Sequence, residues 1–172
     1  MIINSKVVDA MNAQIQSEFG ASAQYVAIAV YFDDSSLPEL ANFFFRQAEE
    51  EREHAMKFVH FLLEAGAKPL IRALPDMVNE FNSPAEAVQF ALDQEIKVTN
   101  QINNIMAIAV EQNDFASQTF LQWFVTEQVE EVDSMDSLLQ TINYSGGALL
   151  LVEDYVRRKM AAEGEAEEEG EE

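Results

Sequence analysis

The sequence predicts an all-α protein: a four-helix bundle with a long connection between its second and third helices and a short fifth helix. Apolar residues recur at alternating steps of three and four in four long stretches, the period of a helix face that packs in a core. Glycine and proline mark the boundaries, and neither occurs from Ala85 to Ser145. The first and third gaps between these stretches are short and the second is long. A long second connection lets the chain cross the bundle, so the second and third helices are expected to be joined by a crossover.

The first two helices have recognisable ends. The first is expected from about Ser5 to Phe32, where the polar run Asp33-Asp34-Ser35-Ser36 ends it. The second opens with Ser36-Leu37-Pro38-Glu39, in which serine and glutamate three apart predict a capping box and proline suits the first turn. This helix is expected to continue to about Ala65, just before a glycine.

The third and fourth helices follow a connection of roughly seventeen residues that contains Pro69 and Pro75. Ser83-Pro84-Ala85-Glu86 repeats the start signal of the second helix. The chain from this point to Ser145 is long enough for two helices, and Asn113-Asp114 is the expected break between them.

The C-terminal part of the chain changes character after Gly146-Gly147. Ala148 to Met160 predicts a short fifth helix. Residues 161–172 combine glutamate with alanine and glycine, a composition typical of disorder. We therefore expect residues 1–160 to form one bundle domain and residues 161–172 to form an acidic disordered tail.

The composition excludes several kinds of site and partner. No cysteine is present, which rules out disulfides, thiolate zinc sites and cysteine-bound iron. The 31 acidic and 10 basic residues give a net charge of −21, and such a surface repels nucleic acid and anionic membranes while it attracts cations. No apolar run approaches membrane-spanning length and no N-terminal stretch looks like a targeting signal, so a cytoplasmic protein is expected.

Polar side chains interrupt every apolar seam near the middle of its helix. An unpaired carboxylate is costly in a core, and no seam contains a lysine or arginine that could pair with one. The seams are Val8, Met11, Ile15, Glu18, Ser22, Tyr25, Ala29 and Phe32; Leu40, Phe44, Gln47, Glu51, His54, Phe58, Phe61 and Ala65; Val88, Ala91, Glu95, Val98, Ile102, Ile105 and Ala109; and Leu121, Phe124, Gln128, Glu131, Met135, Leu138 and Ile142.

Metal ions are the obvious source of the missing positive charge. Glu51 and His54 are three residues apart, so both project from one face of their helix. The carboxylate of such a pair can bridge two metals, and the imidazole can bind one of them. Four carboxylates balance the charge of two divalent ions, which favours a dinuclear site. Iron(II) accepts this mixed oxygen and nitrogen ligation, although manganese and zinc also fit it.

These residues resemble the metal centre of bacterial non-haem ferritins, and the resemblance covers about residues 5–160. It implies that Glu18, Glu51 and His54 bind one iron and that Glu51, Glu95 and Glu131 bind a second. It places Gln128 near the second iron and implies that Tyr25 can supply an electron during oxygen reduction. It also implies a third iron site, nearer the inner surface of the shell, formed by Glu50, Glu127 and Glu130.

Related families fit less well. Bacterioferritins have a second Glu-x-x-His on the fourth helix, where this chain has Gln128 and Glu131, and a haem-binding methionine where it has Arg52. We therefore expect no haem. Rubrerythrins need cysteines that this chain lacks, and DNA-protecting mini-ferritins lack the fifth helix. Trp123 and His60 do not meet the metal layer in this interpretation, so packing or surface roles are expected for both.

The resemblance implies an iron-storage protein with ferroxidase activity. Its substrates would be iron(II) and O2 or H2O2, and twenty-four identical subunits would enclose a ferric oxyhydroxide mineral. Two other functions stay open on the sequence alone. One is a diiron oxidase or peroxidase of the rubrerythrin-like type that stores no mineral. The other is a helical scaffold in which the polar layer only fixes helix register.

Overall fold

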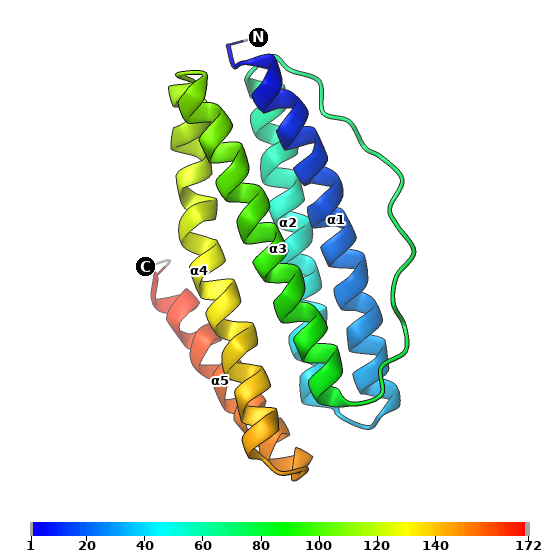
Figure 1. The fold of residues 1–172 in the computed structure, drawn as a ribbon. Helices are drawn as coiled ribbons and strands as arrows, with labels where there is room; N and C mark the ends of the chain where they lie inside the picture. Colours follow the sequence, from blue (N-terminus) through cyan, green and yellow to red (C-terminus); the bar gives the residue numbers. More distant parts are fainter. Residues whose placement is uncertain (1, 171–172) are drawn as a thin grey trace.

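Five α-helices are present in the computed structural model, which describes residues 2–170, with side chains for residues 2–162. The first four form the bundle, and helices adjacent in sequence run antiparallel except α2 and α3, which the crossover at residues 65–83 joins (Figure 1). This arrangement confirms the predicted all-α plan. The helices are α1 (Ser5–Asp34), α2 (Pro38–Glu64), α3 (Pro84–Glu111), α4 (Phe115–Tyr144) and α5 (Leu149–Gly170).

The apolar seams predicted from the sequence form the interior of the bundle. Every seam residue is buried except Val8, Ser22 and Phe61, which are partly buried. The apolar core is divided into two clusters, one at each end of the bundle. One contains the C-terminal half of α1 and the N-terminal parts of α2 and α3, and the other contains the opposite halves of the same helices. The polar seam residues therefore lie between two apolar clusters.

The crossover has no regular secondary structure, and buried amide side chains of α1 hold it in place. The amide of Asn12 donates to the Lys68 carbonyl at 3.3 Å and accepts from the Leu70 N–H at 2.6 Å. Gln24 binds both backbone groups of Val78, donating to the carbonyl at 2.7 Å and accepting from the N–H at 2.9 Å. These bonds satisfy extended backbone that a loop would otherwise leave to solvent.

The predicted capping box at the start of α2 does not form. Ser36 has a positive φ of 60°, and the N-cap residue Leu37 makes no side-chain hydrogen bond. Glu153 of α5 caps the helix instead. Its two carboxylate oxygens each accept a hydrogen bond from a backbone N–H, one from Glu39 and one from Leu40, both at 2.9 Å. The first turn of α2 is thus capped by a residue more than a hundred positions away, and the same bonds attach α5 to the bundle.

We expect Glu153→Gln to lower the free energy of unfolding by about 1–2 kcal/mol, the scale of a lost charged N-terminal cap. The amide keeps one acceptor oxygen but loses the charge that favours the helix N-terminus. Chemical denaturation of the two proteins measures the difference. Asp154→Asn, which removes an exposed carboxylate at the next position, is the matched control and should cost much less. Equal losses in both variants would contradict the capping role.

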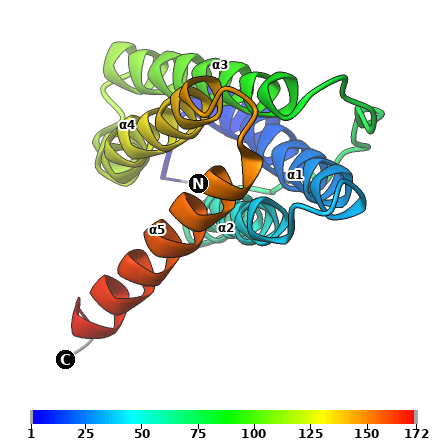
Figure 2. The ribbon, with the colours of Figure 1, turned by 90° about the horizontal axis from the view of Figure 1, so that it is seen from below.

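The fifth helix continues beyond the range expected from the sequence. It extends to Gly170, past Met160, so the backbone of residues 161–170 is helical, and residues 171–172 of the expected acidic tail lie outside the described part. Alanine and glutamate are good helix formers, and this preference outweighs the two glycines at this end. Figure 2 shows α5 extending away from the other four helices.

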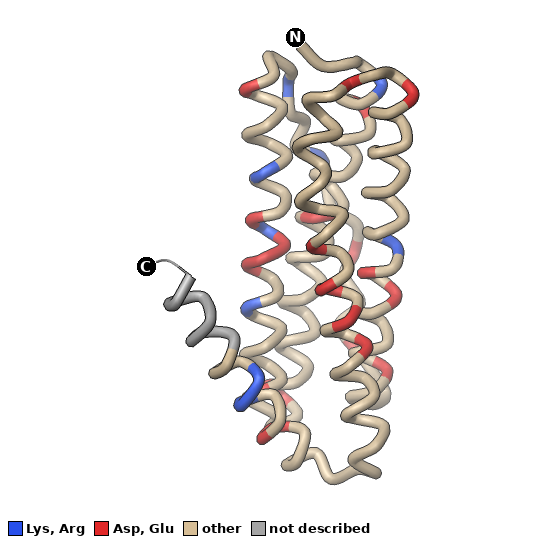
Figure 3. The backbone as a smooth tube through the Cα atoms, turned by 90° about the vertical axis from the view of Figure 1, so that its left-hand side faces the viewer, with Lys and Arg blue, Asp and Glu red and all other residues tan. Residues whose placement is uncertain are grey.

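Acidic residues are distributed along the whole bundle. Figure 3 shows acidic positions along the helices of the bundle and not only toward the C-terminus. Within the described residues, no helix is both long enough and apolar enough to cross a membrane.

Candidate metal centre

A layer of buried polar side chains crosses the middle of the bundle, between the two apolar clusters. Each of the four main helices contributes at least one carboxylate to this layer, and no lysine or arginine is buried anywhere in the described chain. The layer comprises Glu18, Glu51, His54, Glu95, Gln128 and Glu131, all with exposed fractions of 5% or less. The side chains predicted from the seams are thus buried at one level.

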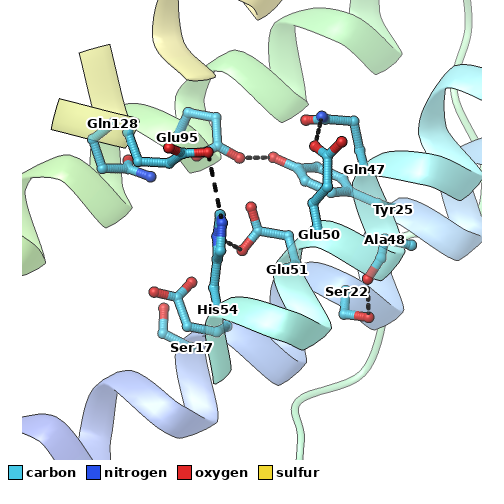
Figure 4. Close-up of polar contacts among 12 residues, drawn as sticks. Ser17, Ser22, Tyr25, Gln47, Ala48, Glu50, Glu51, His54, Glu95 and Gln128 are labelled. Carbon is cyan, nitrogen blue, oxygen red and sulfur yellow. Dashed lines mark hydrogen bonds and ion pairs between the residues drawn. The ribbon is translucent and has the colours of Figure 1, made fainter. Parts of the chain in front are cut away.

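Glu51, His54 and Glu131 form the centre of the layer. One ligand atom from each of these three side chains lies within 4.8 Å of the others, a spacing that could hold a metal ion. The Nδ1 atom of His54 is 3.7 Å from Oε2 of Glu51, and Figure 4 shows both side chains pointing to the same space. The three-residue spacing on α2 produces this geometry because residues i and i+3 share a helix face.

Glu95 faces the same space from α3 and has a tyrosine partner. The hydroxyl of Tyr25 donates a hydrogen bond to Oε1 of Glu95 (Figure 4). One turn further along α3, the Thr99 hydroxyl lies 2.9 Å from Oε1 of Gln128 and 2.8 Å from the Glu95 carbonyl. These contacts fix the position of Glu95 and connect it to the amide on α4, a role for Thr99 that the seam pattern did not indicate.

Four buried carboxylate oxygens in the layer accept no hydrogen bond from an N–H or hydroxyl group of the described residues. They are Oε2 of Glu18, both oxygens of Glu51 and Oε2 of Glu95. The other oxygen of Glu18, Oε1, accepts a hydrogen bond from the Gln14 amide at 2.9 Å. Buried polar atoms without partners are rare in proteins and need an explanation. Cations bound among them would supply one, so the donor set fits one or two metal ions with mixed carboxylate and imidazole ligation.

Burial and mutual repulsion raise the pKa of every glutamate in the layer. For Glu18 and Glu51 the pKa lies well above the ordinary value, first because of burial and then because of neighbouring carboxylates. Burial also raises the pKa of Glu95, against the hydrogen bond from Tyr25. For Glu131, burial and the charge of Glu95 raise the pKa to about 9. The metal-free layer therefore retains protons at neutral pH, which cations would displace.

We expect the metal-free protein to become less stable as the pH rises from about 6 to about 9. In this window Glu131 is protonated in the folded chain (pKa about 9) and ionised in the unfolded chain (pKa 4.5). The folded state binds more protons, so stability falls with pH by up to about 1.4 kcal/mol per unit for each proton retained. Urea denaturation in the presence of a chelator measures this slope. Glu131→Gln should flatten it, and an equal slope in both proteins would contradict the prediction.

The residues expected at a third site are more exposed and are only partly brought together. Oε1 of Glu127, whose side chain is 30% exposed, lies 4.0 Å from Nε2 of His54. Glu50 accepts a hydrogen bond from Gln47 (Figure 4), and it also pairs with Arg46 at 3.6 Å. Glu130 is exposed. The structure thus brings Glu127 next to the buried layer, while Glu50 is engaged by residues of its own helix.

Trp123 lies closer to the layer than its position outside the seam suggested. Its ring meets the His54 ring with a centroid distance of 5.4 Å and an interplanar angle of 73°. The adjacent seam residue Phe124 also contacts His54, at 5.8 Å and 77°. Seam spacing finds residues that point into the bundle, but it misses a large ring at the seam edge that reaches inward. His60 is exposed, as expected for a surface role.

Comparisons with known proteins agree on one family. Residues 8–145 match the family model described as ferritin-like domain. Ferritin BfrB of Mycolicibacterium smegmatis is 45% identical over 151 residues, covering 88% of this chain and 83% of that protein. A bacterial non-heme ferritin of Staphylococcus aureus is 37% identical and covers 83% and 84%. An open pore ferritin of Archaeoglobus fulgidus superposes with a TM-score of 0.88 at 34% identity, covering 90% and 96%.

Proposed function

The chain belongs to the ferritin family, and on that premise we propose that it oxidises iron(II) with O2 at a diiron centre in each subunit and stores the ferric product as mineral. The observation that carries the proposal is the set of four buried glutamates beside a buried histidine, with four carboxylate oxygens that accept no hydrogen bond from an N–H or hydroxyl group of the described residues. A buried structural network would satisfy these atoms, whereas a metal-binding layer leaves them available.

The ligands divide between two iron(II) substrate ions. In our proposal Glu18, Glu51 and His54 hold the first ion, and Glu51, Glu95 and Glu131 hold the second. Glu51 bridges the two ions, consistent with the lack of a hydrogen-bond partner for either of its oxygens. Each iron(II) gives one electron, so the pair reduces O2 to H2O2 with the uptake of two protons. Carboxylate ligands then stabilise the iron(III) product.

Tyr25 and Gln128 act beside the second ion in this proposal. The hydroxyl of Tyr25 is buried and hydrogen-bonded to Glu95, so when Tyr25 gives one further electron to the oxygen species at the centre, its proton passes to Glu95 and a neutral tyrosyl radical remains. Burial and the nearby glutamates raise the pKa of Tyr25 well above its ordinary value, which keeps the hydroxyl protonated before reaction. Gln128 is held by Thr99 at 2.9 Å and offers a neutral polar group on the α4 side of the centre.

A third iron site and a shell complete the proposal. Glu127 is close enough to His54 to receive iron that leaves the centre, and the proposed third site also includes Glu50 and Glu130. We propose that twenty-four subunits form the shell, with exposed apolar residues of α5 such as Leu150 and Leu151 buried between subunits. The relatives named as ferritins support this assembly by family membership.

Storage is tested by loading the purified protein with iron(II) in air, in large excess over the proposed centres. We expect ferric iron to elute with the protein in gel filtration, because a shell retains the mineral. Glu51→Ala is expected to slow loading, with more iron precipitating outside the protein. Iron that oxidises but elutes separately from the protein would contradict storage and would favour a diiron oxidase without mineral.

A further inference from the structure

The geometry points to Trp123 as a positioning residue that orients the His54 imidazole toward the metal layer, and to Lys57 as the residue that holds the Trp123 ring in place. This inference rests on the proposed function, because it concerns how one ligand of that centre is oriented. Neither residue belongs to the proposed set of metal ligands: Trp123 lies outside the seam of α4, and Lys57 is exposed on α2.

Among the residues that the structure describes, none forms with His54 the hydrogen bond that usually orients a metal-binding histidine. Such a ligand ordinarily donates its second ring N–H to a carboxylate or carbonyl, which fixes the tautomer and the ring plane. Here the nearest carboxylate oxygens are 3.7 Å from Nδ1, on Glu51, and 4.0 Å from Nε2, on Glu127. Both distances exceed that of a hydrogen bond. Another contact must therefore set the ring angle.

Two aromatic rings of α4 provide that contact. Trp123 and Phe124 meet the His54 ring edge to face, with interplanar angles of 73° and 77°. The indole and the phenyl ring are themselves nearly perpendicular, at 87° and a centroid distance of 4.9 Å. Edge-to-face contacts have a preferred geometry, so two of them restrict rotation of the imidazole about its bond to Cβ.

Lys57 contacts the same indole one turn after His54 on α2. Its Nζ atom lies 4.4 Å from the ring centroid, a distance typical of a cation–π contact. Trp123 is 41% exposed, so core packing alone constrains it less than it constrains Phe124, which is 1% exposed. His54 and Lys57 together hold the indole at two points from one helix. Loss of either contact should disturb the metal ligand more than the fold.

Cobalt(II) binding tests the inference without iron chemistry, because its visible spectrum reports ligand number and geometry. We expect Trp123→Ala to weaken cobalt(II) binding about tenfold, the lower end for residues that support a metal ligand. Its spectrum should shift toward that of His54→Ala, while Trp123→Phe, which keeps an aromatic edge, should stay close to the unaltered protein. Phe81→Ala is the control, because Phe81 is a partly buried ring that packs on Tyr31 and Phe90 instead.

A spectrum of Trp123→Ala identical to that of the unaltered protein would overturn the inference, even if the variant melts at a lower temperature. His54→Ala distinguishes this result from an error in the proposed function. If His54→Ala also leaves the cobalt(II) spectrum unchanged, the proposed metal centre is wrong, and the inference about Trp123 is then wrong as well.

Lys57→Met supplies a test that does not alter the core, since Lys57 is exposed. Electrostatics alone predict tighter cobalt(II) binding when a positive charge near the centre is removed. The positioning role predicts the opposite sign, a weakening of about threefold, as expected for loss of an exposed cation–π contact. Tighter or unchanged binding would contradict the role of Lys57 in holding Trp123.

Discussion

Glu51→Gln is expected to lower the initial rate of iron(II) oxidation by about a hundredfold or more. Both carboxylate oxygens of Glu51 are buried without hydrogen-bond partners, and they are the atoms proposed to bridge the two ions. An amide offers one weakly coordinating oxygen and no charge, so it cannot bridge two cations. The substitution has nearly the same volume, which preserves packing around the layer. Stopped-flow absorbance of the ferric product measures the rate.

The matched control is Glu53→Gln, which makes the same chemical change at an exposed position of α2. It should leave the rate within about twofold, because a surface charge acts only weakly across solvent. Oxidation by Glu51→Gln at the rate of Glu53→Gln would contradict a bridging role. Such a result would show that iron reacts without the buried pair of sites.

Glu51→Gln should also have opposite effects on stability without and with metal: it should stabilise the metal-free protein and destabilise the metal-bound protein. Without metal, Glu51 is a buried carboxyl that accepts no hydrogen bond from an N–H or hydroxyl of the described residues, and burial raises its pKa well above the ordinary value, so Glu51→Gln should stabilise the protein by about 1–3 kcal/mol. With zinc(II) at a hundred times its dissociation constant, each occupied site stabilises the unaltered protein by about 2.7 kcal/mol. The stabilisation of the unaltered protein by two bound zinc ions is therefore larger than the stabilisation that Glu51→Gln gives without metal.

Thermal melts with chelator and with zinc(II), which does not react with oxygen, measure both halves of this prediction. The variant should melt above the unaltered protein in chelator and below it in zinc(II). Concentration-matched samples are needed, because assembly also changes the melting temperature. A variant that is less stable under both conditions would indicate that Glu51 belongs to a satisfied structural network, contrary to the metal-centre account.

The bundle was predictable because its determinants are local and repeated. Seam spacing identified the buried face of each helix, and the absence of glycine and proline from Ala85 to Ser145 predicted two long helices. The polar layer was predictable for a related reason: Glu18, Glu51, Glu95 and Glu131 interrupt otherwise apolar seams near mid-helix. Their roles as iron ligands remain predictions that the experiments above test.

The features that the sequence did not reveal depend on contacts between distant segments. Glu153 caps α2 from α5, so the Ser36-Leu37-Pro38-Glu39 signal, read locally, predicted a capping box that the tertiary contact replaces. Trp123 reaches His54 from the edge of its seam, which a periodicity of buried positions does not capture.

The most direct test of the central claim is oxygen consumption when two iron(II) ions per subunit are added to the metal-free protein in air, with His54→Ala measured alongside. A diiron centre predicts rapid oxidation with about one O2 consumed per two iron ions. It also predicts markedly slower oxidation in the variant, because one ion loses its imidazole ligand. Equal and slow oxidation in both proteins would contradict the diiron centre and leave the buried glutamates as a site for another metal or a structural network.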